Sequence, residues 1–250
     1  MLKTERVIDL PVTVGSVESL ASEVIQVARD GHGGYVCVAN VHMVINARRD
    51  SNLRKVMEEA FLVTPDGLPL VWSLRQQGIL EAKRVTGTDL TLELCKLSEK
   101  LQISVGFYGS TIDTLSALKG QLSDQYPALK VVFYESPSEL PLHPVVDLTV
   151  VDYINKSGAK IVFVGLGCPK QEYWMAAYAP HLSAVLIGIG AALNFISGTV
   201  TRAPSWMQNM GLEWLHRLFT EPRKIWKRYA TTNPVFIWLV MKEFFKSKVK

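Results

Sequence analysis

The chain has 250 residues and a net charge of +4, a length that suits either one α/β domain with an appendage or two small domains. Hydrophobic residues make up 48% of the sequence and charged residues 20%, which excludes a disordered, collagen-like or coiled-coil chain. The three cysteines lie far apart and form no CxxC pair, which excludes a disulfide scaffold and a cysteine-based zinc or redox motif.

Short β-branched runs alternate with helical patterns along the first 200 residues. Strands are expected over residues 6–10, 35–39, 61–64, 103–108, 130–134, 161–164 and 184–189. Helices are expected over residues 17–28, 41–48, 51–59, 68–76, 89–101, 112–125, 146–156 and 170–179. Continuous apolar runs such as IVFVG are typical of parallel strands buried on both faces. The pattern predicts an α/β fold with a Rossmann-like parallel sheet.

The region after residue 200 differs from the rest in charge and composition. Residues 202–250 carry a net charge of +7 and four of the six tryptophans, whereas the first 201 residues carry −3. Pro222 suits the first position of a helix, and a second amphipathic helical segment is expected over residues 235–248. We therefore expect an α/β domain over residues 1–200 and a basic, aromatic, helical appendage over residues 201–250.

The sequence predicts no membrane-spanning helix. The uncharged stretch over residues 173–201 is long enough to cross a bilayer, but Pro180 interrupts it and its glycines suit a buried strand and a turn. The first residues lack the apolar segment of a signal peptide. The simplest interpretation is a cytoplasmic protein.

Polar residues and glycines follow several of the expected strands. Asn40 follows the strand over residues 35–39, and Asp66 follows the strand over residues 61–64. Five further residues follow later strands: Gly109, Gly165, Gly167, Gly190 and Asn194. Ligands of open parallel sheets bind outside the carboxyl ends of the strands, and glycine lets the backbone approach a ligand closely. These loops are the candidate site.

Four polar residues each have a structural and a chemical interpretation. Asp66 suits a Pro-Asp-Gly turn or a general base. Arg84 suits a solvated surface position or the binding of a diphosphate. Asn40 is either a helix N-cap or a residue of the site. Gln171 is either a solvent-exposed polar residue at the start of a helix or a residue of the site.

Several common motifs are absent from the sequence. No GxGxxG fingerprint, Walker loop, HExxH or GxSxG occurs, no pair of histidines has metal-ligand spacing, and there is no Asp-x-Asp pair. An enzyme that releases a nucleoside diphosphate stabilises the leaving charge with a metal or with fixed cations. In this chain arginines would have to supply the positive charge that stabilises the leaving diphosphate.

Six stretches, taken together in order and spacing, resemble the WecG, TagA and CpsF family, glycosyltransferase family twenty-six, over almost the full length. They are VANVHMV (38–44), PDGLPLV (65–71), RVTGTD (84–89), GLGCPKQE (165–172), GTVTRAPSWM (198–207) and GLEWLHRLFTEP (211–222). The resemblance implies an inverting, metal-independent transferase without a cofactor. Such an enzyme moves a sugar from a UDP-sugar to a sugar on a polyprenyl diphosphate, in the synthesis of bacterial surface polysaccharide or teichoic acid.

The resemblance also implies roles for individual positions. Asp66 corresponds to the family's proposed base, and Asn40, Arg84 and Gln171 correspond to pocket residues. Gly165, Gly167, Gly190 and Asn194 correspond to residues on the nucleotide-binding side of the family's active site. The basic residues of the membrane-binding tail correspond to Arg217, Arg223 and Arg228.

The donor sugar stays open among N-acetylmannosamine, glucose, uronic acids and others. This chain has Val38-Ala39-Asn40 where some members have Thr-Pro-Asn, and Leu193-Asn194 where many have Phe-Asp. Two other classes of function stay open: a Rossmann-type nucleotide-binding protein such as an oxidoreductase, and a membrane-docking scaffold without catalysis.

The expected partners follow from the same features. The basic, aromatic tail favours docking on an anionic membrane, with packing of the tail on the body as the alternative. No nucleic-acid recognition motif accompanies the charge, so no nucleic acid partner is expected. We expect a cytoplasmic protein bound peripherally to the inner face of the cell membrane, and a homo-oligomer stays open.

Overall fold

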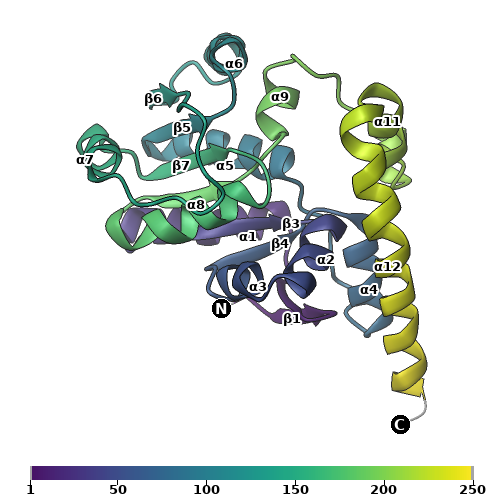
Figure 1. The fold of residues 1–250 in the computed structure, drawn as a ribbon. Helices are drawn as coiled ribbons and strands as arrows, with labels where there is room; N and C mark the ends of the chain where they lie inside the picture. Colours follow the sequence, from purple (N-terminus) through teal and green to yellow (C-terminus); the bar gives the residue numbers. More distant parts are fainter. Residues whose placement is uncertain (1, 249–250) are drawn as a thin grey trace.

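A six-stranded parallel sheet forms the centre of the molecule (Figure 1). The computed structural model describes residues 2–248, apart from the side chains of Asn209, Lys224 and residues 244–248. The strand order is β4-β3-β8-β7-β5-β6. In chain order the strands are β3 (Gly34–Ala39), β4 (Leu62–Pro65), β5 (Val105–Gly109), β6 (Val131–Glu135), β7 (Ile161–Gly165) and β8 (Val185–Gly188). The predicted α/β fold with a Rossmann-like parallel sheet is confirmed.

Helices cover both faces of the sheet. Those of the first 200 residues are α1 (Val17–Asp30), α2 (Val41–Arg49), α3 (Ser51–Glu58), α4 (Leu68–Gln76), α5 (Gly87–Leu101), α6 (Ile112–Gln125), α7 (Leu148–Ser157), α8 (Lys170–Tyr178), the 3-10 turn η1 (Ala179–His181) and α9 (Ala192–Ile196). Side chains alternate along each strand. Val36 and Val38 of β3 pack in one core with α1 and α5, whereas Tyr35 and Cys37 pack in a second core with α2, α3 and α8.

The expected strand over residues 6–10 is wrong. The chain forms an antiparallel hairpin there, β1 (Thr4–Val7) and β2 (Leu10–Thr13), which is separate from the parallel sheet. Ile8 takes a positive φ of 59° in the turn, a conformation that a β-branched residue rarely adopts and that sequence patterning does not anticipate. The Thr13 hydroxyl accepts a hydrogen bond from the Val63 N–H at 3.3 Å, so the hairpin covers the β4 edge of the sheet. The other expected elements of the first 200 residues are found, with ends that differ by at most two residues.

The C-terminal segment forms three helices. They are α10 (Ser205–Asn209), α11 (Glu213–Thr220) and α12 (Pro222–Lys248). The predicted helix start at Pro222 is confirmed, but the segment over residues 235–248 is not a separate helix, because α12 continues through Pro234. Proline removes one backbone donor, and here the Thr231 and Thr232 hydroxyls each bind a carbonyl one turn back, at 2.7 Å.

The long helix α12 lies along the flank of the molecule that carries α2 and α4 (Figure 1). Its buried side chains Phe236 and Leu239 belong to the same core as α2, α3 and α8. The Arg49 guanidinium of α2 also donates to the Thr231 carbonyl of α12 at 3.1 Å. The basic, aromatic C-terminal helices are therefore packed on the α/β body in this structure.

Candidate active site

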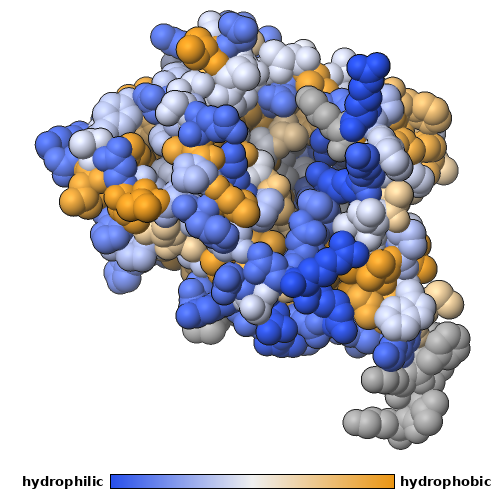
Figure 2. Space-filling view, in the orientation of Figure 1, coloured by the Kyte–Doolittle hydropathy of each residue, from blue (hydrophilic) through white to orange (hydrophobic). Residues whose placement is uncertain are grey.

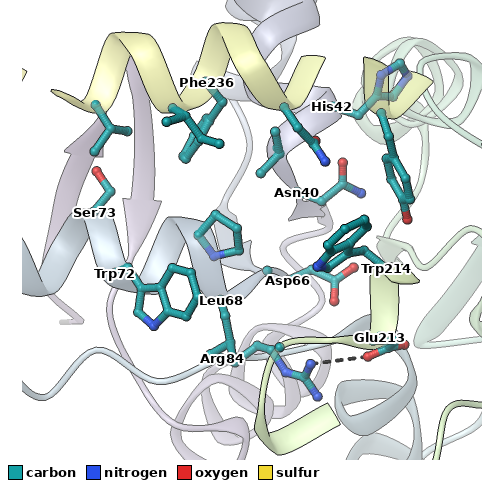
Figure 3. Close-up of a pocket in the computed structure, with 18 of the residues that line it drawn as sticks. Asn40, His42, Asp66, Leu68, Trp72, Ser73, Arg84, Glu213, Trp214 and Phe236 are labelled. Carbon is teal, nitrogen blue, oxygen red and sulfur yellow. Dashed lines mark hydrogen bonds and ion pairs between the residues drawn. The ribbon is translucent and has the colours of Figure 1, made fainter. Parts of the chain in front are cut away.

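A pocket of about 540 Å³ lies at the carboxyl ends of β3 and β4, between α4 and the C-terminal helices (Figure 3). The loops after these two strands, α4, α11 and α12 all contribute to its wall. Its charged and strongly polar lining side chains include Asn40, His42, Asp66, Arg84, Glu213, Arg217 and Arg228. Five residues predicted from separate parts of the sequence therefore meet in one cavity: Asn40, Asp66, Arg84, Arg217 and Arg228.

Asp66 is positioned by the loop that joins β4 to α4. Its backbone N–H donates to the Ala39 carbonyl at 2.8 Å, which places Asp66 beside the end of β3. Gly67 then caps α4. Burial and, next, the nearby charge of Glu213 raise the pKa of the Asp66 carboxyl to about 7, against the opposing effect of Arg84 and Arg217. Near neutral pH a substantial fraction of this carboxyl is ionised and can accept a proton.

Arg84 forms an ion pair with Glu213 at the Asp66 end of the pocket (Figure 3). The Arg84 Nη1 and Glu213 Oε2 atoms are 3.2 Å apart, and both side chains are largely buried. The next residue, Val85, donates its N–H to the Pro65 carbonyl at 2.9 Å, so the segment that carries Arg84 runs beside the end of β4. This geometry places a guanidinium next to Asp66, and the interpretation of Arg84 as a solvated surface residue is wrong.

Asn40 fits both of its predicted roles, helix N-cap and site residue. It caps α2, since its side-chain oxygen accepts the Met43 N–H at 3.2 Å, and it also lines the pocket. Two residues along, His42 lines the pocket with its Nε2 atom 3.0 Å from the Asn46 Nδ2 atom. Burial, together with Arg228 and Arg49, lowers the pKa of His42 to about 4, so this imidazole is neutral at pH 7.

The three predicted tail arginines separate into two groups. Arg217 and Arg228 line the pocket, whereas Arg223 is exposed and does not. Arg217 is paired with Glu221 at 3.5 Å, and its guanidinium lies 5.5 Å from the centre of the Phe195 ring in α9. Among the described residues, the Nε atoms of Arg217 and Arg228 are buried without a hydrogen-bond partner. The wall therefore holds positive charge that an anionic ligand could share.

The predicted nucleotide-side residues form a second cluster, at the carboxyl ends of β5, β7 and β8. Gly109 has a φ of +107°, and a Cβ there would lie 2.7 Å from the Gly165 backbone, so glycine is required where these two strands end. Ser110 donates its N–H to the Gly165 carbonyl at 3.1 Å, and its hydroxyl lies 3.4 Å from the Asn194 Oδ1 atom. These residues do not line the pocket, but Asn194 directly precedes the Phe195 ring that Arg217 covers.

Gln171 is buried within this second cluster, so the interpretation of Gln171 as polar surface is wrong. Its side-chain oxygen accepts the Gly167 N–H at 3.3 Å, and its nitrogen donates to Glu172 Oε1 at 2.7 Å. A Cβ on Gly188 would lie 3.0 Å from the Gln171 nitrogen, and one on Gly190 would lie 3.5 Å from its oxygen. Gln171 therefore hydrogen-bonds the loop after β7 and packs against the end of β8.

The described residues include neither a metal-ligand cluster nor a membrane-spanning helix. No group of three or more His, Cys, Asp or Glu side chains among them is arranged to hold a metal ion. Within residues 2–248, none of the helices combines the length and the apolar composition that a bilayer crossing needs.

Comparison with known proteins identifies the family. The model of the "Glycosyl transferase WecG/TagA/CpsF family" matches residues 5–250. The chain belongs to this family. The resemblance noted in the sequence is confirmed, and the protein is a glycosyltransferase.

Two relatives of this glycosyltransferase have the same name, N-acetylglucosaminyldiphosphoundecaprenol N-acetyl-beta-D-mannosaminyltransferase. The protein from Bacillus subtilis (strain 168) is 31% identical over 214 residues, which cover 84% of this chain and 80% of the relative. The protein from Bacillus spizizenii is 28% identical over 212 residues, which cover 84% of this chain and 79% of the relative.

Sequence reasoning missed several residues of this glycosyltransferase's pocket. Glu213, Trp214 and Tyr229 line the cavity, but no role was expected for any of them. Glu213 and Trp214 lie within the 211–222 stretch that resembles the family, so that stretch was the available signal. Outside the pocket, no role was expected for Glu172 either. This residue is buried beside Gln171, and burial raises its pKa to about 7.

Proposed function

We propose that this glycosyltransferase moves a sugar from a UDP-sugar to a sugar carried on a polyprenyl diphosphate, with inversion at the anomeric carbon and without a metal. The observation that carries the proposal is Asp66, a carboxyl with a pKa of about 7 in a pocket that also presents Arg84, Arg217 and Arg228. The names of the two Bacillus relatives support N-acetylmannosamine as the first donor sugar to test and a polyprenyl-diphosphate-linked N-acetylglucosamine as the first acceptor.

Asp66 acts as the general base. The acceptor hydroxyl oxygen forms a bond to the anomeric carbon while its proton passes to the Asp66 carboxylate. The bond from that carbon to the UDP oxygen breaks, and UDP leaves with the electron pair. One displacement of this kind inverts the configuration of the anomeric carbon. Asn40, which follows β3 beside Asp66, is positioned to bind a hydroxyl of the acceptor.

The donor lies across the two clusters of residues. The glycine loops after β5, β7 and β8 hold the nucleotide, since the space beside Gly167 is open and Gln171 hydrogen-bonds the loop after β7. Arg84 stabilises the charge that develops on the departing UDP, in place of a metal. The Arg217 contact with Phe195 joins the nucleotide cluster to the pocket.

The outward side of α12 docks on the inner face of the cell membrane. Trp238 is exposed there, and the ammonium group of Lys242 lies 5.0 Å from its ring centre. Near the start of α12, Trp226 is also exposed, and the ammonium group of Lys227 lies 5.7 Å from its ring centre. Figure 2 shows hydrophobic and strongly hydrophilic side chains next to each other on this part of the surface. Aromatic rings enter the headgroup boundary, and each Lys or Arg near an anionic surface contributes about 1 kcal/mol.

Ligand binding followed by transfer tests the proposal. UDP at a hundred times its dissociation constant should stabilise the protein by about 2.7 kcal/mol in thermal unfolding, whereas NAD should leave the midpoint unchanged. UDP-N-acetylmannosamine and a polyprenyl-diphosphate-linked N-acetylglucosamine should then yield UDP and an inverted product, at the same rate with and without EDTA. A response to NAD alone, or transfer that EDTA abolishes, would contradict the proposal.

A further inference from the structure

The pocket extends from Asp66 into a groove between α4 and α12 whose wall is largely apolar (Figure 3). Its apolar lining side chains include Leu68, Trp72, Phe236, Ile237, Val240 and Met241. Ser73, Gln76 and Asn233 are the polar side chains on this part of the wall. The proposed reaction at Asp66 does not require such a groove, because the reacting groups of both substrates are sugars and phosphates.

The two ends of the cavity differ in chemistry. At one end Arg84, Arg217 and Arg228 surround Asp66, and the Nε atoms of Arg217 and Arg228 are buried without a hydrogen-bond partner among the described residues. At the other end the wall is formed by α12 from Asn233 to Met241, about 12 Å of helix, and by the facing side of α4. A cavity that is cationic at one end and apolar at the other fits an amphiphile with an anionic head.

The apolar groove also leaves large side chains incompletely covered. Trp72 of α4 is 52% exposed, and Ile237 and Met241 of α12 are 58% and 54% exposed. These three side chains line one cavity with buried Phe236, so the exposed apolar surface here is concave and continuous rather than scattered. A cavity of about 540 Å³ lies within the range of pockets that bury most of a drug-sized ligand.

We propose that the groove between α4 and α12 binds the isoprenoid chain next to the diphosphate of the lipid-linked acceptor, with the diphosphate at Arg217 and Arg228. This inference rests on the proposed function for the identity of the acceptor. The enzyme then binds part of the lipid directly, and the membrane is not the only apolar environment that the chain meets. The groove also orients the acceptor, since a chain held along α12 directs its sugar toward Asp66.

The groove and the membrane-docking side belong to different faces of α12. Consecutive residues of a helix point about 100° apart, and Ile237 lines the groove whereas Trp238 does not. The two neighbours are nearly equally exposed, at 58% and 59%. They therefore form a matched pair in which one substitution changes the groove and the other changes the docking side.

Binding of two soluble diphosphates, without membranes or donor, tests the inference. Farnesyl diphosphate should bind the wild-type protein at least about tenfold more tightly than methyl diphosphate, because burying even one large apolar group is worth that factor. Ile237→Asn and Trp72→Ser, from opposite walls, should each reduce this ratio severalfold and leave the affinity for methyl diphosphate unchanged. Trp238→Ser should keep the ratio, and so should Ile112→Asn, the same substitution at a 74% exposed position of α6.

The outcomes separate the groove from the proposed function. Equal affinities for the two diphosphates would contradict the proposal that the groove binds the isoprenoid chain. An equal decrease of the affinity ratio in Trp238→Ser and Ile237→Asn would contradict it as well. If the ratio behaves as expected but no sugar is transferred to a lipid-linked acceptor, the groove stands and the proposed function fails. With transfer established, Ile237→Asn should raise the KM for a farnesyl-linked acceptor and leave kcat unchanged, whereas a methyl-linked acceptor should show no difference.

Discussion

Asp66 and Glu172 have the same unusual pKa in two different settings. Burial raises the pKa of each carboxyl to about 7. Asp66 lines a cavity and interacts with the charges of Glu213, Arg84 and Arg217. Glu172 is fully buried behind the glycine loop after β7, where Gln171 donates to it at 2.7 Å. A raised pKa alone therefore does not identify a base, because only the carboxyl that opens onto a cavity can receive a substrate proton.

The largest expected effect comes from Asp66→Asn. A general base contributes 10²- to 10⁴-fold, so kcat should fall by about that factor while UDP still binds. In the wild type, the carboxylate is the active form, so the rate should rise with pH and level off above about pH 7. The measurement is the pH profile of transfer for both proteins, and the acid limb should be absent from the residual activity of the variant.

Glu172→Gln is the matched control for that loss, because it removes a carboxyl of the same pKa from outside the cavity. It should retain the acid limb near pH 7 and most of kcat. If Glu172→Gln lost the limb and Asp66→Asn kept it, the assignment of the base would be reversed.

The next largest effect is the pH dependence of stability that Glu172 causes. The pKa of Glu172 is raised in the folded state, so its contribution to stability is present below its ordinary pKa of 4.5 and is lost as the pH rises toward 7. Glu172→Gln lacks this loss. Relative to the wild type, its free energy of unfolding should therefore increase by up to about 3 kcal/mol between pH 4.5 and pH 8. Urea unfolding at the two pH values measures this, and a difference independent of pH would show that Glu172 does not titrate as proposed.

The neighbourhood of Asp66 was predictable from sequence in part. Asn40 and Asp66 follow apolar runs of consecutive parallel strands, and the carboxyl ends of such strands share one edge of a sheet. This local pattern was sufficient to bring the two residues together. It could not assign Glu213, whose contact with Arg84 joins positions 129 residues apart.

The elements that sequence reasoning missed depend on tertiary context. The β1–β2 hairpin turns at Ile8, which has a positive φ. Isoleucine is not a turn-forming residue type, so the sequence does not indicate a turn at this position. The helix α12 continues through Pro234, and Phe236 and Leu239 just beyond it are buried in the core. Burial of Gln171 and Glu172 likewise depends on how the loops after β7 and β8 pack, because composition alone suggests a solvated start of a helix.

A smaller effect on the rate is expected from Arg84→Gln. Hydrogen bonds to charged groups are worth about 1.5 to 3 kcal/mol, so transfer should fall by about 10- to 100-fold and UDP should bind more weakly. The Arg84 guanidinium favours the ionised form of Asp66, so its removal should raise the pKa of Asp66 and move the acid limb to higher pH. Arg84→Lys keeps the charge without the planar fork and should restore the position of the limb better than the rate. A limb that stays in place in Arg84→Gln would mean that Arg84 does not act on Asp66.

The smallest effect, and the sharpest comparison of the two carboxyls, is expected from Glu213→Gln. After burial, Glu213 is the largest cause of the raised pKa of Asp66, so its removal should lower that pKa and move the acid limb to lower pH, by less than about one unit. The shift is opposite in sign to that of Arg84→Gln, although both substitutions break the same 3.2 Å ion pair. If the broken ion pair itself caused the shift, the acid limb would move in the same direction in both variants. If each charge acts directly on Asp66, the acid limb moves in opposite directions in the two variants. Glu58→Gln, at an exposed pair with Arg6, should move nothing. Neither pocket substitution should change the stability titration of Glu172, since Glu213 and Arg84 are not among the groups that shift its pKa.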